Sequence, residues 1–206
     1  MKLESLESLP NSDKVKLHLS DGSCLRVPRV TAADAGLCVG MELDEETLRR
    51  LSERAAYDST RLRAVRILGA SATSEKDLRR KLLQKGENKE NTERTIAWLN
   101  DLQLIDDRET ALRIAERAGS RGYGAARVRQ ILYEKGIPKE YWEEALSRLP
   151  DPSKEILRYL RAHLSCSDPD RKEKKKISDA LIRRGYSWDA IRRGFETLQI
   201  SSEEEF

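Results

Sequence analysis

Hydrophobic and polar residues alternate near the start of the chain, which is the pattern of strands with one buried face. Apolar residues occupy every second position on either side of an Asp-Gly pair: Val15, Leu17, Leu19, Leu25 and Val27. This pattern predicts a β-hairpin. A two-residue loop would pair Leu17 with Arg26 and place an arginine on the apolar face. We favour a three-residue loop with a glycine bulge, which is expected to pair Leu19 with Leu25 and Leu17 with Val27.

A further short strand is expected around residues 37–41, beside this hairpin. After residue 44 the apolar spacing changes to three or four residues, the period of a helix. Asp44 is expected to cap a helix whose buried stripe is Leu48, Leu51 and Ala55. Ser59 is expected to cap the next helix, whose inward positions would be Leu62, Val65 and Leu68. Ser74-x-x-Asp77 resembles a capping box that opens another helix.

A nine-residue pattern occurs three times in the helical part. The three copies are LRRKLLQKG at 78–86, VRQILYEKG at 128–136 and ISDALIRRG at 177–185. Matching positions are 50 and 49 residues apart, and an apolar-periodic segment precedes each copy. Constant spacing of this kind predicts tandem repeats of three helices in an elongated array. The expected parts are a β-rich extension over 1–43, a linking helix over 44–58, and repeats over 59–106, 107–150 and 151–206, the last with an acidic tail.

The glycine at the end of each copy is expected to end its helix. A residue just past a helix end often adopts the left-handed conformation, which glycine tolerates best. Ile137 and Tyr186 can fold back onto the preceding helix, whereas Glu87 predicts a looser cap in the first copy. The basic residue before each glycine suits the negative end of the helix dipole.

Composition and charge bound the class of protein. Charged residues make up 36% and aromatic residues 5% of the 206 residues. No stretch approaches a membrane helix and no signal-peptide core is present, so we expect a cytoplasmic protein without a membrane partner. Residues 1–60 carry a net charge of −3 and residues 61–200 a net charge of +9. A basic body of this kind suits a polyanion or an acidic partner.

The residues that usually carry catalysis or bind metals are scarce. Cys24, Cys38 and Cys166 are scattered without a CxxC, and the two histidines are His18 and His163. A disulfide framework, a zinc site or a histidine-based active site is therefore not expected. We expect no enzyme activity, no catalytic residues, no metal site and no cofactor.

Two short segments could still carry chemistry. Asp106 and Asp107 could act as paired carboxylates, but Asp106 with Glu109 fits a capping box, which we favour. SRGYGAARVRQIL places Gly122 and Gly124 before a helix, where backbone N–H groups could approach a phosphate. The spacing is not that of a P-loop or a dinucleotide fingerprint, and a solvated helix start explains it equally well.

The densest basic run is DRKEKKKI, over residues 170–177. It could contact a nucleic-acid backbone or form a solvated loop. The three tryptophans fall in the third helices of their repeats. Trp142 and Trp188 lie on the apolar stripe and are expected in the core rather than as base-stacking platforms, whereas Trp98 is expected to be partly exposed.

The order of these elements from about Tyr57 to Leu198 resembles the RecX family of bacterial regulatory proteins, which modulate the RecA recombinase. The resemblance rests on SEKDLRRKLLQKG, LNDLQLIDDRETA and GYGAARVRQILYEKGI, and more weakly on ISDALIRRGYSWDAI. It implies a mainly α, curved molecule that lies in the groove of a RecA–single-stranded DNA filament and modulates the activity of the recombinase in DNA repair and recombination, usually by limiting filament growth or strand exchange. The chain departs from the family pattern at LGASATSE, where an arginine commonly precedes the serine.

From charge and position we expect the RecA or DNA contacts to come from two sets of residues. The middle repeat would supply Arg121, Arg127, Arg129 and Lys135, and the third would supply Lys172, Lys174, Lys175 and Lys176. The alternative hypothesis is a helical protein that binds nucleic acid alone, without a recombinase partner. A monomer is expected, because no apolar stripe is left over after the intramolecular packing.

Overall fold

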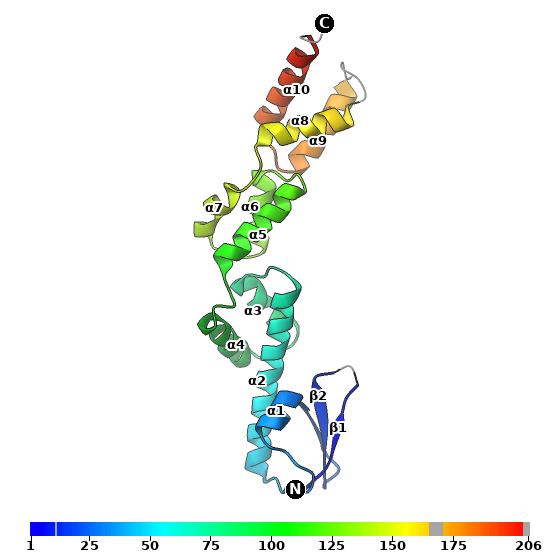
Figure 1. Cartoon of the computed structure of the whole chain (residues 1–206), viewed down its shortest axis with the longest axis vertical. Coiled ribbons are helices and arrows are strands. Elements are labelled where there is room, and N and C mark those ends of the chain that lie inside the picture. Colours follow the sequence, from blue (N-terminus) through cyan, green and yellow to red (C-terminus); the bar gives the residue numbers. More distant parts are fainter. Residues whose placement is uncertain (11, 165–170, 204–206) are drawn as a thin grey trace. The chain divides into compact units, whose positions relative to one another are not determined.

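The computed structural model of the protein describes residues 1–10, 12–164 and 171–203, with side chains up to residue 198. Cys166, Asp170 and the acidic tail over 204–206 lie outside the described residues. The chain divides into two compact units, one formed by residues 1–71 and 78–104 and the other by residues 72–77 and 105–206. The fold is mainly helical and includes one small antiparallel sheet (Figure 1). Among the described helices, none is long and apolar enough to cross a membrane.

The sheet contains the predicted hairpin. Its strands are β1 (Leu3–Ser8), β2 (Lys14–Leu19) and β3 (Cys24–Pro28), in that order. The three-residue loop is confirmed, since the Leu19 N–H donates to the Ser23 carbonyl at 3.0 Å and Gly22 has a φ of 81°. The predicted pairs are wrong, because Leu17 pairs with Leu25 and Val15 with Val27. A shift of two residues keeps the same side chains on the same face, so alternation alone cannot fix this register.

The third strand of the sheet is β1, which the sequence pattern did not predict. Its first residue, Leu3, is its one buried residue, so the segment shows no alternation. The strand expected at 37–41 is wrong. That segment follows a short helix, α1 (Arg29–Asp34), and forms turns. It still contacts β1, since the Gly40 N–H donates to the Leu3 carbonyl at 2.8 Å.

A single helix, α2 (Glu45–Ala70), occupies the stretch where two were expected. Its predicted cap is confirmed, because the Asp44 carboxylate accepts from the Thr47 N–H at 2.7 Å. The predicted cap at Ser59 is wrong, since a serine inside a helix costs only a fraction of a kcal/mol, about 0.5, and no glycine or proline interrupts the helix there. Val65 is 46% exposed, contrary to prediction, and the neighbouring Ala64 is buried in its place.

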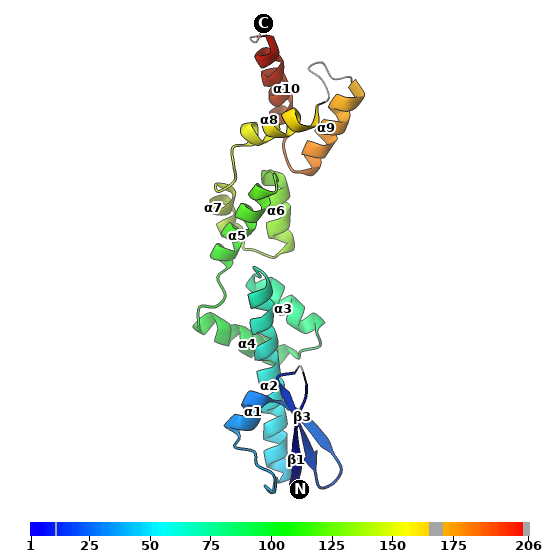
Figure 2. The same cartoon turned by 45° about the vertical axis from the view of Figure 1, so that its right-hand side comes forward.

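The remaining helices form the rest of the three-helix groups. They are α3 (Glu75–Gln84) and α4 (Lys89–Asp101); α5 (Asp107–Ser120), α6 (Ala125–Glu134), the short η1 (Lys139–Tyr141) and α7 (Trp142–Leu146); and α8 (Pro152–His163), α9 (Arg171–Arg183) and α10 (Trp188–Glu203). We call α5–α7 the middle bundle and α8–α10 the last bundle. In the middle bundle α5 packs against both α6 and α7, and in the last bundle α8 packs against both α9 and α10 (Figures 1 and 2).

The repeated pattern forms the same structure in all three copies. Its shared leucine is fully buried each time, at Leu82, Leu132 and Leu181. The glycines that follow have positive φ angles of 84°, 70° and 92°, as the helix-ending prediction requires. The looser cap expected at Glu87 is wrong, since its N–H donates to Leu82 at 3.2 Å as the equivalent bonds do in the other copies. Its carboxylate meets Thr60 and Arg63 instead.

Candidate interaction site between the middle and last bundles

Two glycines bring the middle and last bundles into backbone contact. The Gly124 N–H donates to the Arg184 carbonyl at 2.8 Å, and the Ala126 N–H donates to the Gly185 carbonyl at 3.3 Å. A Cβ on Gly124 would lie 2.6 Å from the Gly185 oxygen, a distance that side chains do not tolerate. Gly124 is buried, and its N–H is used. Both interpretations offered for this glycine, a phosphate-binding backbone and a solvated helix start, are therefore wrong.

The same contact occurs one repeat earlier, between the start of α3 and the end of α6. The Ser74 hydroxyl donates to the Lys135 carbonyl and also accepts from the Asp77 N–H at 3.1 Å, which confirms its predicted capping role. Ser74 and Gly124 are equivalent positions of the repeat, as are Lys135 and Arg184. The C-terminal end of a repeated helix thus contacts the N-terminal end of the previous one.

The contact at Gly124 gathers arginines and tyrosines around a pocket of about 670 Å³. Its lining residues come from both bundles and are Arg121, Tyr123, Arg127, Tyr159, Ala180, Arg183 and Arg184. We call this the arginine pocket. Four of these seven residues are arginines and none is acidic. A cavity of this composition can accept phosphate or carboxylate groups.

Two arginines of the pocket, Arg127 and Arg184, are positioned by neutral groups. The Arg127 guanidinium donates to the Gln130 side-chain oxygen at 2.7 Å, and that of Arg184 donates to the Arg121 carbonyl at 3.3 Å. Arg184 also lies over the Tyr159 ring, 4.6 Å from its centre. Within the described part of the chain, no carboxylate forms an ion pair with any of the four arginines. Their positive charge therefore remains available to a partner.

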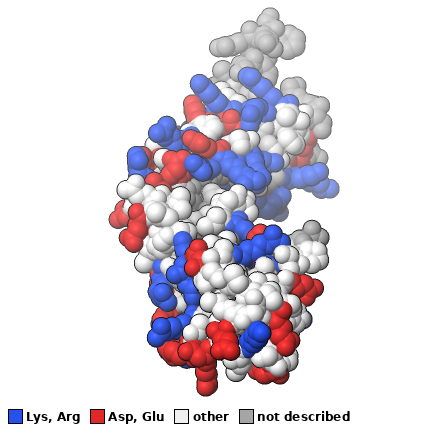
Figure 3. Space-filling model, turned by 60° about the horizontal axis from the view of Figure 1, so that its bottom comes forward, with Lys and Arg blue, Asp and Glu red and all other residues white. Residues whose placement is uncertain are grey.

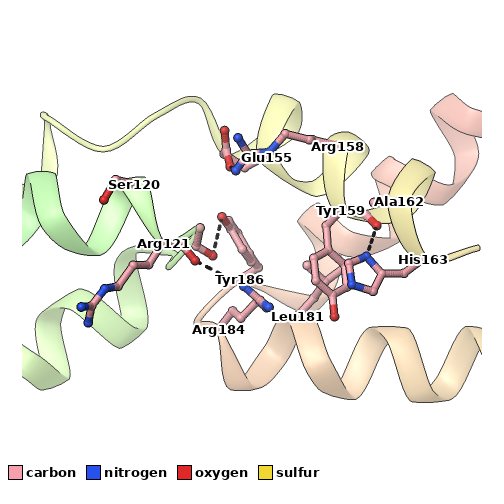
Figure 4. Close-up of a pocket in the computed structure, with 11 residues that line it drawn as sticks. Ser120, Arg121, Glu155, Arg158, Tyr159, Ala162, His163, Leu181, Arg184 and Tyr186 are labelled. Atoms are coloured by element: carbon pink, nitrogen blue, oxygen red, sulfur yellow. Dashed lines mark hydrogen bonds and ion pairs between the residues drawn. The ribbon is translucent and has the colours of Figure 1, made fainter.

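A smaller cavity of about 370 Å³ adjoins the arginine pocket (Figure 4). Tyr186 crosses it, and its hydroxyl donates to the Gly122 carbonyl at 3.2 Å. Burial, and secondarily the charge of Glu155, raises the pKa of the Tyr186 hydroxyl, which keeps this donor protonated. On the other side, the Tyr159 and His163 rings stack with their centres 3.9 Å apart. The Tyr186 hydrogen bond joins the two bundles, whereas the Tyr159–His163 stack lies within α8.

The structure brings two of the four residues predicted in the middle bundle into the pocket. Arg121 and Arg127 line it. Arg129 lies outside it, and its guanidinium is 3.8 Å from the Glu143 carboxylate. The Lys135 ammonium lies 3.2 Å from the Asp77 carboxylate, which is fully buried. Lys135 thus has a structural task within the protein, whatever it contributes to a partner.

The four lysines predicted in the third repeat all lie near the start of α9. Lys174 and Lys175 line a groove between α9 and α10, whereas Lys172 and Lys176 are exposed outside it. The run predicted at 170–177 is therefore mostly helix from residue 171 onward. Sequence reasoning missed Arg183 and Arg184, because the basic residues before each glycine were assigned to the helix dipole alone. Their signal was a second consecutive arginine, which only the third copy has.

The tryptophans divide differently from the prediction. Trp142 is half-buried and its indole N–H donates to the Ile137 carbonyl at 3.0 Å, in keeping with a core position. Trp98 is partly exposed as expected. Trp188 is 59% exposed, so its predicted core position is wrong. It lies at the first residue of α10, where the apolar stripe has not yet met the neighbouring helices.

The paired carboxylates serve the fold. Asp106 accepts from the Glu109 N–H at 2.8 Å, which confirms its capping role at α5. Asp107 accepts from the Glu75 N–H at 2.9 Å. Burial raises the pKa of the Asp107 carboxyl, against the opposing effect of this hydrogen bond. Among the described residues, no group of histidine, cysteine and acidic side chains has an arrangement that could hold a metal ion.

Charge on the visible surface is mixed. On the face shown in Figure 3, basic and acidic side chains are interspersed over most of the described surface.

Two family models match this chain. One is described as the second three-helix domain of RecX and matches residues 106–146, and the other is its third three-helix domain and matches residues 155–196. The proteins named Regulatory protein RecX from Salmonella typhi and Salmonella typhimurium are each 34% identical to this chain over 154 residues. These alignments cover 69% of this chain and 93% of each relative.

Two solved structures share the fold. A structure titled Crystal structure of regulatory protein RecX has a TM-score of 0.62 at 20% identity, covering 93% of this chain and 98% of its own. RecX from Lactobacillus salivarius has a TM-score of 0.58 at 21% identity, covering 70% of this chain and 97% of its own.

Proposed function

Because this chain belongs to the RecX family of regulatory proteins, we propose that it regulates a RecA recombinase by binding the RecA–single-stranded DNA filament. The effect proposed is inhibition, since a protein lodged in the filament obstructs the addition and movement of recombinase subunits. The family supports regulation of RecA. The filament contact and the inhibitory sign rest on the argument that follows.

The arginine pocket is the observation that carries the proposal. Four guanidinium groups line the pocket, and those of Arg127 and Arg184 are held by neutral acceptors, so the pocket offers paired donors to phosphate or carboxylate groups. A nucleoprotein filament presents both, from its DNA and from acidic side chains of its protein. Replacing one of these arginines by a neutral residue would leave no carboxylate among the described residues without an ion-pair partner, so their charge is not needed for pairing within the protein.

Repetition adds to the strength of such contacts. The end of one repeated helix meets the start of the previous one at equivalent positions, so basic residues recur at regular intervals along the chain. Several weak contacts to successive subunits of a filament act together through their high effective concentration. The protein is therefore expected to bind the filament more tightly than it binds the free recombinase or the free DNA.

The test is a titration of the protein into a reaction that measures the DNA-dependent ATPase of the recombinase from the same organism. Inhibition below one molecule per recombinase subunit is expected. The variant Arg121→Gln, Arg127→Gln, Arg183→Gln should need about tenfold more protein for half its effect, since three solvent-exposed charge contacts of about 0.5 kcal/mol each together contribute about 1.5 kcal/mol. The matched control Arg49→Gln, Arg50→Gln, Arg113→Gln also removes three positive charges, all from arginines with acidic partners.

Two results would count against this proposal. If the ATPase is unaffected although filaments form, the chain does not regulate this recombinase in the way proposed. If both triple variants lose activity equally, net charge matters and the pocket does not. Tight binding to free DNA with a steep salt dependence, without any effect on the recombinase, would favour the stand-alone nucleic-acid binder.

A further inference from the structure

The three tryptophans differ in which groups of the protein already contact their indole rings. The Arg61 guanidinium lies over the Trp98 ring, 3.8 Å from its centre. The Trp142 indole N–H is bonded to a carbonyl and its ring packs in the core of the middle bundle. Trp188 is 59% exposed, and within the described part of the chain no guanidinium lies over its ring. A large exposed indole without a partner costs free energy in water, which makes it a candidate for an external ligand.

Trp188 lies in a groove of about 670 Å³ between α9 and α10. Ile191 and Phe195 supply further apolar surface along α10. The groove has four basic residues, Arg171, Lys174, Lys175 and Arg192, against two acidic ones, Asp179 and Glu196. Glu196 is 3.4 Å from Arg192, so one acid is matched to one base within the groove itself. On α9, Arg171 and Lys175 outnumber Asp179 in the lining of the groove, so a net positive charge remains.

We propose that this groove binds single-stranded DNA directly, with a base stacked on the Trp188 ring and the neighbouring phosphates held by the basic residues of α9. An aromatic face beside a positively charged groove is the arrangement that binds single strands without sequence preference, because every base has a π-face. The proposal rests on the proposed function, and it names the component of the filament that the last bundle contacts.

Charge complementarity and shape favour this ligand over others. An acidic peptide would satisfy the cations but would leave the indole without a partner. Duplex DNA would also satisfy the cations, but its bases are stacked on one another and cannot reach the indole. An unpaired strand offers an aromatic face and a phosphate within the same nucleotide, which matches both halves of the groove.

The experiment uses the full chain without recombinase and measures the anisotropy of a labelled oligothymidylate of about 15 nucleotides, close to the upper site size of single-strand binders. Trp188→Ala should bind it about tenfold more weakly, as expected for the loss of one base stack. Trp188→Phe should retain binding within about threefold, because a phenyl ring also stacks. Ile182→Ala removes another exposed apolar side chain, on α9 and outside the groove, and should change nothing.

Two further readouts identify stacking itself. Binding should quench tryptophan fluorescence in the wild type, and this quenching should disappear in Trp188→Phe even though that variant still binds. An oligonucleotide with abasic sites keeps its phosphates but has no bases. Wild type and Trp188→Ala should therefore bind the abasic strand with equal affinity.

Equal affinity of folded Trp188→Ala and wild type for oligothymidylate would overturn the proposal. So would a Trp188→Ala variant that binds the DNA normally and loses only its effect on the recombinase, since the groove would then be a protein contact. Because DNA binding is measured without the recombinase, failure of the ATPase test leaves this result standing and the two proposals can fail separately.

Discussion

The first and third copies of the repeated helix end in the same way but in different surroundings. At the end of α3, a Cβ on Gly86 would meet no atom within 4 Å, so this glycine does nothing beyond capping. At the end of α9, a Cβ on Gly185 would overlap the backbone nitrogen of Arg127. The shared residues thus encode the fold, and the surroundings decide whether a helix end is also an interface.

The basic residues before these glycines also differ in their surroundings. Lys85 is exposed, and its carbonyl accepts from Arg63 at 3.4 Å. Arg183 and Arg184 both line the arginine pocket. Arginines of the N-terminal unit such as Arg49 and Arg54 are paired with carboxylates at 2.7 and 2.9 Å. Charge that is neutralised within the protein supports its own fold, whereas charge held by neutral acceptors is left for a partner.

The largest expected effect is the loss of stability when the glycine at the end of α9 is replaced. Gly185→Ala should lower the free energy of unfolding by about 3 kcal/mol, because the left-handed conformation and the overlap with Arg127 both oppose a methyl group. Gly86→Ala should cost only about 1 kcal/mol, the conformational part alone. Urea unfolding of the two variants measures the difference, and equal losses would show that Gly185 serves only as a cap.

A second pair compares the basic residues of the first and second copies. Lys135→Ala should cost about 2 kcal/mol, because it leaves the buried Asp77 carboxylate without its 3.2 Å partner. That figure is set below the usual cost for a buried pair, since Lys135 itself is 35% exposed. Lys85→Ala should change stability by less than about 0.5 kcal/mol, as for other surface positions. Similar thermal shifts in the two variants would contradict the structural task assigned to Lys135.

The smallest expected effect concerns Asp107, at the start of the middle bundle. Burial raises its pKa, so the folded protein holds this proton to a higher pH than the unfolded chain does. Its contribution to stability is therefore full at low pH and is lost as the pH rises through the folded pKa. Asp107→Asn keeps an oxygen that can accept from the Glu75 N–H and removes the charge.

The Asn variant should be slightly more stable than the wild type at about pH 7, and the difference should shrink at about pH 3, below the ordinary pKa of an aspartate. Thermal unfolding at the two pH values measures this. A variant that is less stable than the wild type at the higher pH would show that the carboxylate charge strengthens the hydrogen bond more than burial opposes it.

Much of the fold follows from the sequence because helix periodicity and glycine caps are local signals. The glycine ends and the caps at Asp44, Ser74 and Asp106 were all predicted correctly. Strand β1 was missed because only Leu3 is buried in it. Ser59 was misread because a polar residue that often starts helices also fits inside one.

The site was harder to predict, because it depends on contacts between segments far apart in the sequence. Arg121 and Arg127 were named from their charge, but Arg183, Arg184 and Tyr159 join them only through the contact of Gly124 with Gly185. The exposure of Trp188 was missed for a related reason. Its place on the apolar stripe of α10 indicated burial. However, Trp188 is the first residue of that helix and remains exposed.

The central claim is that the charge of the arginine pocket acts on a RecA filament, and one comparison tests it most directly. The measurement is the protein concentration that half-inhibits the recombinase ATPase, taken for two triple variants. The pocket variant is Arg121→Gln, Arg127→Gln, Arg183→Gln, and its concentration is divided by that of the control variant, Arg49→Gln, Arg50→Gln, Arg113→Gln. We predict a ratio of about ten, from the loss of charge-assisted contacts in the pocket variant alone. A ratio of one, with both variants folded, would contradict the account.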